Sequence, residues 1–451
     1  MLGQKKIRAI CDQVLAASPA DQTEVVVLGE DSGLTRFANS YIHQNVAESN
    51  VELRVRVVLG KHPEARIGVA STNDLSAAAV RRVVETATTI AQHQKENSEF
   101  RSLPGPAPIS ALDAFVERTA GFTPEGRAQV AGLICQKAVD AGVVASGAFT
   151  TGSYEFAVAN SLGTFAYFPT TLADINTVIM SDTGSGYADF SSLDVTDIVD
   201  RGEAIAGEAV GKALRSRNPV ALAPGDYEVI LEEYAVADIL DFLGYLGFSA
   251  QAVQEGRSFM GGKFGQKIVG ENVTIWDDGL SLANLPTPFD FEGVPKQRIT
   301  FFDKGIATAV VYDSYTAGKE DKQSTGHALP APNMFGPLPL HMAMATGDST
   351  KEAMLKGIKK GLWVTRFHYT RVVHPLLTII TGMTRDGTFL IENGEITQPV
   401  KNLRFTQSYL EALNNVEAIG QTAKLERGFL GGTLVPALKI AKFTFSGATE
   451  F

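Results

Sequence analysis

The feature that most constrains the fold is the run Val51–Val57, in which apolar residues alternate strictly with Glu52, Arg54 and Arg56. A period of two is typical of a β-strand with one face buried and the other, here the arginine face, in water. The other elements predicted in this region are a helix over 5–17, strands over 24–28, 34–39 and 67–70, and a helix to about His93 that Asn73 or Asp74 caps. Together they predict an N-terminal α+β domain over residues 1–100.

Two stretches rich in proline and glycine divide the chain. Ser102–Pro108 has proline at every second position, which the interior of a helix or strand does not tolerate. Asn218-Pro219 and Pro224-Gly225 mark a second boundary. A length of 451 residues suits two or three domains. We therefore expect domains over 1–100, 113–218 and 224–451.

The central region, 113–218, is predicted to contain both helices and strands. Thr123-Pro124 is typical of a helix start, because threonine caps a helix and proline fits its first turn. That helix is expected to end near Ala141-Gly142. Alternating residues over 146–190, interrupted by Asn160–Gly163, predict a hairpin, and a helix from about Val195 to Arg217 ends the region.

The C-terminal region, 224–451, is predicted to be rich in strands. A strand over Tyr227–Leu231 precedes a helix from Glu232 to Gly247. Asp386-Gly387 and Asn393-Gly394 are both typical of two-residue hairpin turns. The remaining expectations are strands over 378–384, 388–392, 395–397 and 438–445, and a helical or irregular segment over 409–419. The fold class is therefore α+β, with N-terminal and central α/β units followed by a large β-rich C-terminal domain of mainly antiparallel sheets.

Composition and charge argue against several classes of partner. The chain has 40 basic and 50 acidic residues and no long basic stripe, whereas a protein that binds a polyanion needs a basic surface to release counterions. No apolar run of membrane-spanning length and no signal peptide is seen. The cysteines, Cys11 and Cys135, lie in apolar helical stretches and are expected to be core thiols. We therefore expect a cytoplasmic protein with no direct nucleic-acid partner and no membrane.

Common catalytic motifs are missing or incomplete. Gly256–Lys263 resembles a phosphate-binding loop, but its lysine comes one residue late and Phe264 replaces the magnesium-binding hydroxyl. None of the seven histidines forms a His-x-x-x-His pair, whose one-turn spacing lets two imidazoles bind one zinc ion. Asp277-Asp278-Gly279 favours a turn, because adjacent strand residues point to opposite faces. The residues alone predict no self-sufficient metal or nucleophile site.

An ordered set of short motifs runs along the chain. In order, they are Thr35–Ser40, Ile42–Gln44, Gly256–Lys267, Val273–Gly279, Phe291–Pro295, Tyr312–Ala317, Ser324–Ala328, Leu390–Ile396 and Pro399–Lys401. Over nearly the whole chain this set resembles the TldD/PmbA family, once called modulators of DNA gyrase. The resemblance implies a metalloprotease of two subunits that forms a closed dimer, admits unfolded peptides and cleaves them.

The resemblance also implies that the two subunits differ. A TldD-like subunit carries His-Glu-x-x-x-His on a helix and a third zinc ligand, a cysteine, near its C-terminus, whereas a TldE- or PmbA-like subunit lacks these residues. Counting back from Gly256 without gaps, Asp241 takes the place of the first histidine, Phe242 that of the glutamate and Leu246 that of the second histidine. A simpler role for Phe242 and Leu246 is to pack a core. The C-terminal stretch 427–432 contains no cysteine.

No nearby residue replaces these ligands, because no histidine or cysteine occurs between Cys135 and His327. We therefore expect no catalytic residue, metal or cofactor in this chain, and zinc only in a TldD-like partner. The main hypothesis is a non-catalytic, substrate-guiding subunit of a TldD/TldE-type metalloprotease that cleaves unfolded peptides. The alternatives are a homodimeric peptide-binding protein and a repurposed hydrolase that uses His327 with Glu320 or Asp321.

Seven residues are candidate contacts with a peptide or a partner subunit: Gly261, Gly262, Gly265, Gln266, Tyr315, Thr325 and His327. The glycines would let another backbone approach closely, although turn geometry alone would also explain them. The loop 316–326 would reach the peptide or the partner, or would be an ordinary surface loop.

Overall fold

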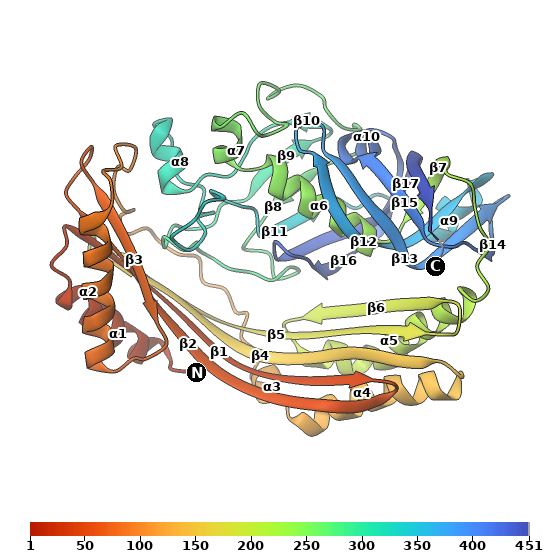
Figure 1. Cartoon of the computed structure of the whole chain (residues 1–451), viewed down its shortest axis with the longest axis horizontal. Coiled ribbons are helices and arrows are strands. Elements are labelled where there is room, and N and C mark those ends of the chain that lie inside the picture. The colour runs from red at the N-terminus through yellow and green to blue at the C-terminus, as the bar shows by residue number, and fades with distance from the viewer. Residues whose placement is uncertain (450–451) are drawn as a thin grey trace.

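The computed structural model describes residues 1–449, which form two β-sheets with helices packed around them (Figure 1). The first sheet has six antiparallel strands in the order β3-β2-β1-β4-β5-β6. These strands are β1 (Gln22–Ala38), β2 (Tyr41–Leu59), β3 (Arg66–Thr72), β4 (Val144–Asn160), β5 (Phe165–Met180) and β6 (Ser185–Ser192).

The first sheet spans both the N-terminal and the central region. Strand β1 pairs with β4 without a break, from Glu24 opposite Asn160 to Phe37 opposite Gly147. The stretches 1–100 and 113–218 therefore share one sheet, although the proline-rich stretch separates them in sequence. Local turn signals predict hairpins but carry no information on a pairing of two segments this far apart in the chain.

Each half of this sheet has its own helices and its own apolar core. Helices α1 (Gln4–Ala17) and α2 (Ala77–His93) cover the half around β1–β3, and α3 (Glu117–Ala120), α4 (Pro124–Asp140) and α5 (Val195–Arg215) cover the other half (Figure 1). The cap predicted at Thr123 is confirmed. The cap predicted at Asn73 or Asp74 is wrong, because Ser76 accepts the hydrogen bond from the Ala79 amide. Cys11 and Cys135 are buried free thiols, as predicted.

The second sheet has eleven strands and contains the C-terminal region, which confirms the predicted β-rich character. Most of its pairs are antiparallel, and β11–β17 and β12–β7 are parallel. The strands are β7 (Gly225–Leu231), β8 (Ile275–Asp277), β9 (Ile299–Asp303), β10 (Ile306–Ala307), β11 (His341–Met344), β12 (Lys360–His374), β13 (Ile379–Glu392), β14 (Glu395–Pro399), β15 (Leu403–Ser408), β16 (Val416–Arg427) and β17 (Gly432–Ala448). Its helices are α6 (Glu233–Gly247), α7 (Ala250–Gln254), α8 (Ser314–Lys319), α9 (Lys351–Lys356) and α10 (Tyr409–Asn414).

Five of these strands close into a ring, because β7 pairs with both β12 and β17, while β13 and β15 complete the circuit. Helix α6 contacts β12 and β17 and contributes to the main apolar core of this region, together with aromatic side chains such as Phe367, Phe405 and Phe443. No helix within residues 1–449 combines the length and the apolar character needed to cross a bilayer.

One of the two predicted hairpin turns is wrong. Asn393-Gly394 does connect β13 to β14. Asp386-Gly387 instead lies inside the continuous strand β13, where both residues have positive φ and face Thr365 of β12 as a bulge. The same left-handed conformations suit a hairpin and a bulge, so the dipeptide does not distinguish between them.

Candidate functional site

Helix α6 is buried on nearly every side. Its sequence is apolar around most of the circumference, with Asp238 and Asp241 as exceptions, which is typical of a helix inside a core. Ile239 and Leu243 are 0% exposed, and Phe242 and Leu246 belong to the same apolar core. Phe242 also stacks edge-to-face with Tyr409 and Phe429. Apolar packing therefore fills the positions that correspond to the glutamate and the second histidine of a metal helix.

Asp241 connects α6 to the loop between β16 and β17. Its Oδ2 accepts a hydrogen bond from the Phe429 amide at 3.1 Å, and its Oδ1 accepts one from the Thr433 hydroxyl at 3.2 Å. Gly428 makes this approach possible, because a Cβ there would lie 1.8 Å from Oδ2 of Asp241. The two segments that the resemblance identifies with zinc ligands therefore lie side by side, and protein donors satisfy the carboxylate between them.

Two neighbouring carboxyl groups on α6 have raised pKa values. Burial, with a smaller contribution from Asp238, raises the pKa of Asp241 to about 7. Burial also raises the pKa of Asp238 to about 6, although hydrogen bonds from the hydroxyls of Tyr409 and Thr370 oppose the shift. Asp241 is 3% exposed, and removal from water disfavours the charged form of a carboxyl group.

A cavity of about 240 Å³ lies beside these carboxyls, between α6, β6 and the end of β16. Of the other charged side chains around it, Asp189 and Glu426 pair with Lys424, and Arg366 pairs with Asp386, while Arg427 forms no ion pair within residues 1–449. Within residues 1–449 no three histidine, cysteine or acidic side chains are arranged to hold a metal ion. With Phe242 and Leu246 in place of donors, the residues present do not fit a zinc site.

The glycine-rich candidates form an exposed turn. Gly262 and Gly265 have φ values of +70° and +80°, and a Cβ at either would meet no atom within 4 Å. Gln266 donates from its side-chain amide to the carbonyl of Gly262. Gly261 is also exposed. The positive φ values therefore explain the glycines at 262 and 265. A close approach of another part of residues 1–449 does not explain them.

The other three candidates lie in and behind helix α8. Tyr315 is in that helix, and its hydroxyl donates to Glu99 at 2.7 Å. The hydroxyl of Thr325 accepts a hydrogen bond from the Tyr312 amide and lies 2.9 Å from Nδ1 of His327. His327 is 1% exposed, so neither a peptide nor a partner subunit would reach its ring without local opening.

The predicted pairing of His327 with Glu320 or Asp321 is wrong. Nε2 of His327 lies 2.9 Å from Oδ1 of Asp277, while Glu320 pairs with Lys322 and Asp321 pairs with Arg101. Burial alone would raise the pKa of Asp277, but neighbouring His327 and Lys296 hold it well below its usual range. Asp277 is a buried strand residue and not the turn residue that its sequence neighbours indicate, because β8 continues to it.

Comparisons with known proteins identify the family of this chain. Residues 224–447 match the PmbA/TldA metallopeptidase C-terminal domain, and residues 23–91 match PmbA/TldA metallopeptidase domain 1. The chain belongs to the PmbA/TldD family. The resemblance seen in the short motifs is thereby confirmed.

The relatives of this chain differ in how much of their own length aligns with it. The metalloprotease PmbA of Escherichia coli is 26% identical over 448 residues, which cover 95% of this chain and 94% of that protein. The match to a metalloprotease of Methanothermobacter thermautotrophicus is 27% identical and covers 56% of this chain and 55% of that protein. An uncharacterised protein of Methanocaldococcus jannaschii is 34% identical, but the match covers 33% of this chain and 35% of that protein.

Two solved structures share the fold over nearly the whole chain. TldE from Thermococcus kodakarensis superposes with a TM-score of 0.88 at 20% identity, covering 98% of this chain and 100% of that one. A structure titled as a putative modulator of a DNA gyrase, from Thermotoga maritima, superposes with a TM-score of 0.86 at 18% identity, again covering 98% and 100%. The fold of this PmbA/TldD chain is therefore that of TldE.

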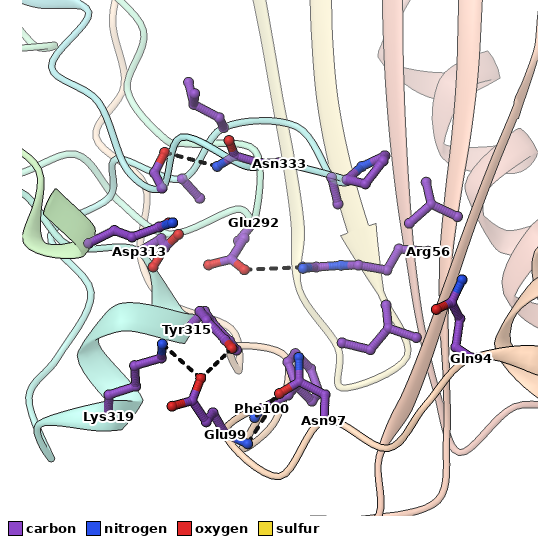
Figure 2. A pocket seen from close by; sticks show the side chains of 18 of the residues that line it. Arg56, Gln94, Asn97, Glu99, Phe100, Glu292, Asp313, Tyr315, Lys319 and Asn333 are labelled. Atoms are coloured by element: carbon purple, nitrogen blue, oxygen red, sulfur yellow. Dashed lines mark hydrogen bonds and ion pairs between the residues drawn. The ribbon is translucent and has the colours of Figure 1, made fainter. Parts of the chain in front are cut away.

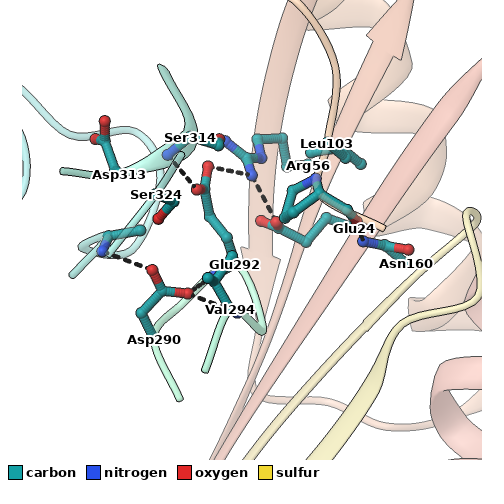
Figure 3. Close-up of polar contacts among 12 residues, drawn as sticks. Glu24, Arg56, Leu103, Asn160, Asp290, Glu292, Val294, Asp313, Ser314 and Ser324 are labelled. Atoms are coloured by element: carbon teal, nitrogen blue, oxygen red, sulfur yellow. Dashed lines mark hydrogen bonds and ion pairs between the residues drawn. The ribbon is translucent and has the colours of Figure 1, made fainter. Parts of the chain in front are cut away.

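Sequence reasoning missed a buried ionic cluster between the first sheet and the C-terminal region. Arg56 is 9% exposed, although the alternation predicts it on the wet face of its strand. Its Nη2 donates to Glu24 at 2.5 Å and to Glu292 at 3.2 Å, and Glu292 also accepts a hydrogen bond from the Ser314 amide (Figure 3). The C-terminal region covers this face of the strand, which no pattern within the strand reveals.

Proposed function

We propose that this chain is the non-catalytic, substrate-guiding subunit of a TldD/TldE-type metallopeptidase that cleaves unfolded peptides. The environment of Asp241 carries the proposal. At the position of a first zinc ligand the carboxylate accepts hydrogen bonds from Phe429 and Thr433, and at the position of the general base stands the buried ring of Phe242. A carboxylate satisfied in this way offers neither a metal site nor a base for water.

An exposed apolar surface beside α6 supports a role in assembly or peptide binding. A cavity of about 980 Å³ is lined by side chains that include Tyr245, Met334, Phe335 and Leu376. Met334 is 86% exposed and Phe335 is 56% exposed, and the ring of Tyr245 lies 6.1 Å from that of Phe429. Large apolar side chains gathered in this way mark surfaces that another chain covers. In the proposed complex an extended peptide would be held chiefly through its backbone, which is largely independent of sequence.

The experiment that tests this function measures metal content and peptide hydrolysis for the purified chain, alone and mixed with a TldD-like metallopeptidase. We expect the chain alone to be free of zinc and inactive, and the mixture to cleave an unfolded peptide in a chelator-sensitive manner. A mixture containing a TldD-like subunit without its metal-helix glutamate is the control for contaminating proteases. Stoichiometric zinc with cleavage by this chain alone would overturn the proposal.

The same samples separate the proposed heterodimer from the alternative, a homodimeric peptide-binding protein. The exposed surface around Tyr245 and Phe335 would be covered in either assembly, so the mass of the complex decides. A heterodimer predicts that the mass changes when the TldD-like subunit is added. A homodimer predicts an unchanged mass together with peptide binding and no cleavage.

A further inference from the structure

A second, polar cavity of about 680 Å³ lies between the first sheet and the C-terminal region (Figure 2), and it shares Leu329, Pro332 and Asn333 with the apolar cavity beside α6. Its walls come from both parts of the chain. The polar side chains that face it include Arg56, Gln94 and Glu99 from the N-terminal region and Glu292, Asp313 and Tyr315 from the C-terminal region. Nothing in the α6 site accounts for a cavity of this size and polarity.

Acidic groups outnumber basic groups at the inner end of this cavity. A single guanidinium, that of Arg56, forms ion pairs with both Glu24 and Glu292. Asp313 adds a third buried carboxylate, at 8% exposure. The other cation in the wall, Lys319, is already paired with Glu99 at 2.8 Å. Since a buried carboxylate without a cation is costly, the cluster can accept one more positive charge.

One oxygen of Asp313 has no partner. Its Oδ1 accepts hydrogen bonds from the amide and the hydroxyl of Thr316, at 2.7 and 2.6 Å, and caps helix α8. No group within residues 1–449 donates a hydrogen bond to its Oδ2, which is open to the cavity, whereas the Nε of Arg56 in the same cluster is buried and has no partner. Burial and the charge of Glu292 raise the pKa of Asp313, which agrees with an incompletely neutralised carboxyl.

We propose that this cavity binds the cationic end of an arginine or lysine side chain, with Asp313 and Glu292 as the acceptors. Charge-assisted hydrogen bonds from a guanidinium or ammonium group would satisfy the free oxygen of Asp313 and balance the surplus of carboxylates. Ile67, Val69 and the ring of Phe100 also line the cavity and suit the methylene stem of such a side chain. The inference rests on the proposed function only in taking the ligand to be part of a peptide.

Isothermal titration calorimetry on the full chain alone tests the proposal with blocked tripeptides. Acetyl-Gly-Arg-Gly-amide and acetyl-Gly-Lys-Gly-amide are compared with the citrulline peptide, a neutral isostere of the arginine peptide. We expect the arginine peptide to bind about tenfold more tightly than the citrulline peptide. The neutral citrulline side chain cannot form the charge-assisted hydrogen bonds that a guanidinium group donates to Asp313 and Glu292. Triglycine amide with a free amino terminus shows whether an α-ammonium group suffices. Equal affinities for the arginine and citrulline peptides would overturn the proposal.

Two variants and one control connect the preference to this cavity. Asp313→Asn keeps the helix cap, because asparagine caps as well as aspartate, and it should abolish the preference for arginine. Asp321→Asn removes the same charge from an exposed side chain nearby and should leave the preference intact. Gln94→Lys places a cation in the opposite wall, at an exposed residue, and should weaken binding of the arginine peptide. A preference that survives Asp313→Asn and Gln94→Lys would contradict the assigned site. No metal-bearing partner is present, so this outcome is independent of the hydrolysis experiment.

Discussion

The backbone amide of Phe429 donates a hydrogen bond to the carboxylate of Asp241, 188 residues earlier in the chain, over 3.1 Å. This contact joins helix α6 to the loop that precedes β17 without a metal ion. A structural zinc ion would make the fold depend on metal, whereas a hydrogen-bonded carboxylate does not. We therefore expect the chain to differ from a zinc-dependent subunit in how its stability responds to metal removal.

Metal removal is expected to leave the stability of this chain unchanged. We predict the same thermal unfolding midpoint with and without EDTA, since the α6 site offers no ligand set for zinc. Differential scanning calorimetry at one protein concentration checks the prediction, with a TldD-like metallopeptidase as the metal-dependent control. A midpoint that falls in EDTA and recovers on addition of zinc would show that metal ligands exist outside α6.

Asp241→Ala is predicted to destabilise the folded chain by about 2 kcal/mol, because the part-buried amide of Phe429 and the buried hydroxyl of Thr433 would both lose their acceptor. Asp182→Ala is the matched control, since Asp182 is an exposed carboxylate in a turn. Urea unfolding of both variants measures the difference. A loss no larger than that of the control would mean that water replaces the carboxylate at little cost.

The raised pKa of Asp241 predicts the sign of a pH effect. The pKa of this carboxyl is about 7 in the folded chain, against 3.8 for an unperturbed aspartate. Between these values the folded state binds more protons than the unfolded state, so the contribution of Asp241 to the free energy of unfolding falls as the pH rises. Asp238, raised to about 6, contributes with the same sign over a narrower range.

Asp241→Asn is therefore expected to make the pH dependence of stability less negative between about pH 5 and pH 8. Groups that do not interact with Asp241 contribute equally to the wild-type chain and the variant, so the difference in slope reports Asp241 together with its effect on the neighbouring Asp238. Urea unfolding across the range provides the slopes, and Asp182→Asn should leave the slope of the wild type unchanged. Parallel curves for the wild type and Asp241→Asn would contradict the raised pKa.

Gly428→Ala tests the closeness of the same contact. The added Cβ would lie 1.8 Å from Oδ2 of Asp241, so the loop or the carboxylate must move, and we expect a loss of about 1–3 kcal/mol. Gly211→Ala is the control, because Gly211 lies in helix α5 with no atom within 4 Å of its added Cβ. That change should stabilise the chain by about 0.5–1 kcal/mol. A neutral Gly428→Ala would mean that the loop moves freely from α6.

Local pattern predicted much of the fold and little of the sites. The helix from Glu232 to Gly247 and the Thr123-Pro124 start of α4 are predicted from neighbouring residues, and both predictions are confirmed. The bulge at Asp386-Gly387 was predicted as a turn, because the backbone conformation is local but the strand pairing that continues past it is not. The pairing of β1 with β4 is non-local for the same reason.

Asp241 and Arg56, one from each site, show what local sequence pattern cannot predict. The distance of Asp241 from the motif at Gly256 matches it to the position of the first zinc-binding histidine. Its hydrogen bonds to Phe429 and Thr433, however, depend on a segment almost two hundred residues away. Arg56 was predicted to be exposed, because strand alternation shows which residues share a face and cannot show what covers that face. A charged residue on the apparent wet face is therefore the signal most easily misinterpreted.

Arg56→Leu is predicted to destabilise the folded chain strongly. The change leaves Glu24 and Glu292, at 2% and 4% exposure, without their cation, and loss of one member of a buried ion pair costs about 3–5 kcal/mol. Arg54→Leu is a closely matched control on the same strand and face. Arg54 is partly exposed, pairs with Glu52 and donates to the carbonyl of Ala331, so its loss should cost about 1 kcal/mol or less.

Acid should partly rescue Arg56→Leu. Burial raises the pKa of Glu24 to about 7 even with Arg56 present, because the opposing effect of the guanidinium does not outweigh it. Without that guanidinium the carboxyl binds its proton still more readily, and a neutral acid is far less costly to bury than a carboxylate. The difference in unfolding free energy between wild type and Arg56→Leu should therefore shrink from about pH 8 to about pH 5. Equal losses for Arg54→Leu and Arg56→Leu at both pH values would show that the cluster between the two sheets contributes no more than a surface ion pair.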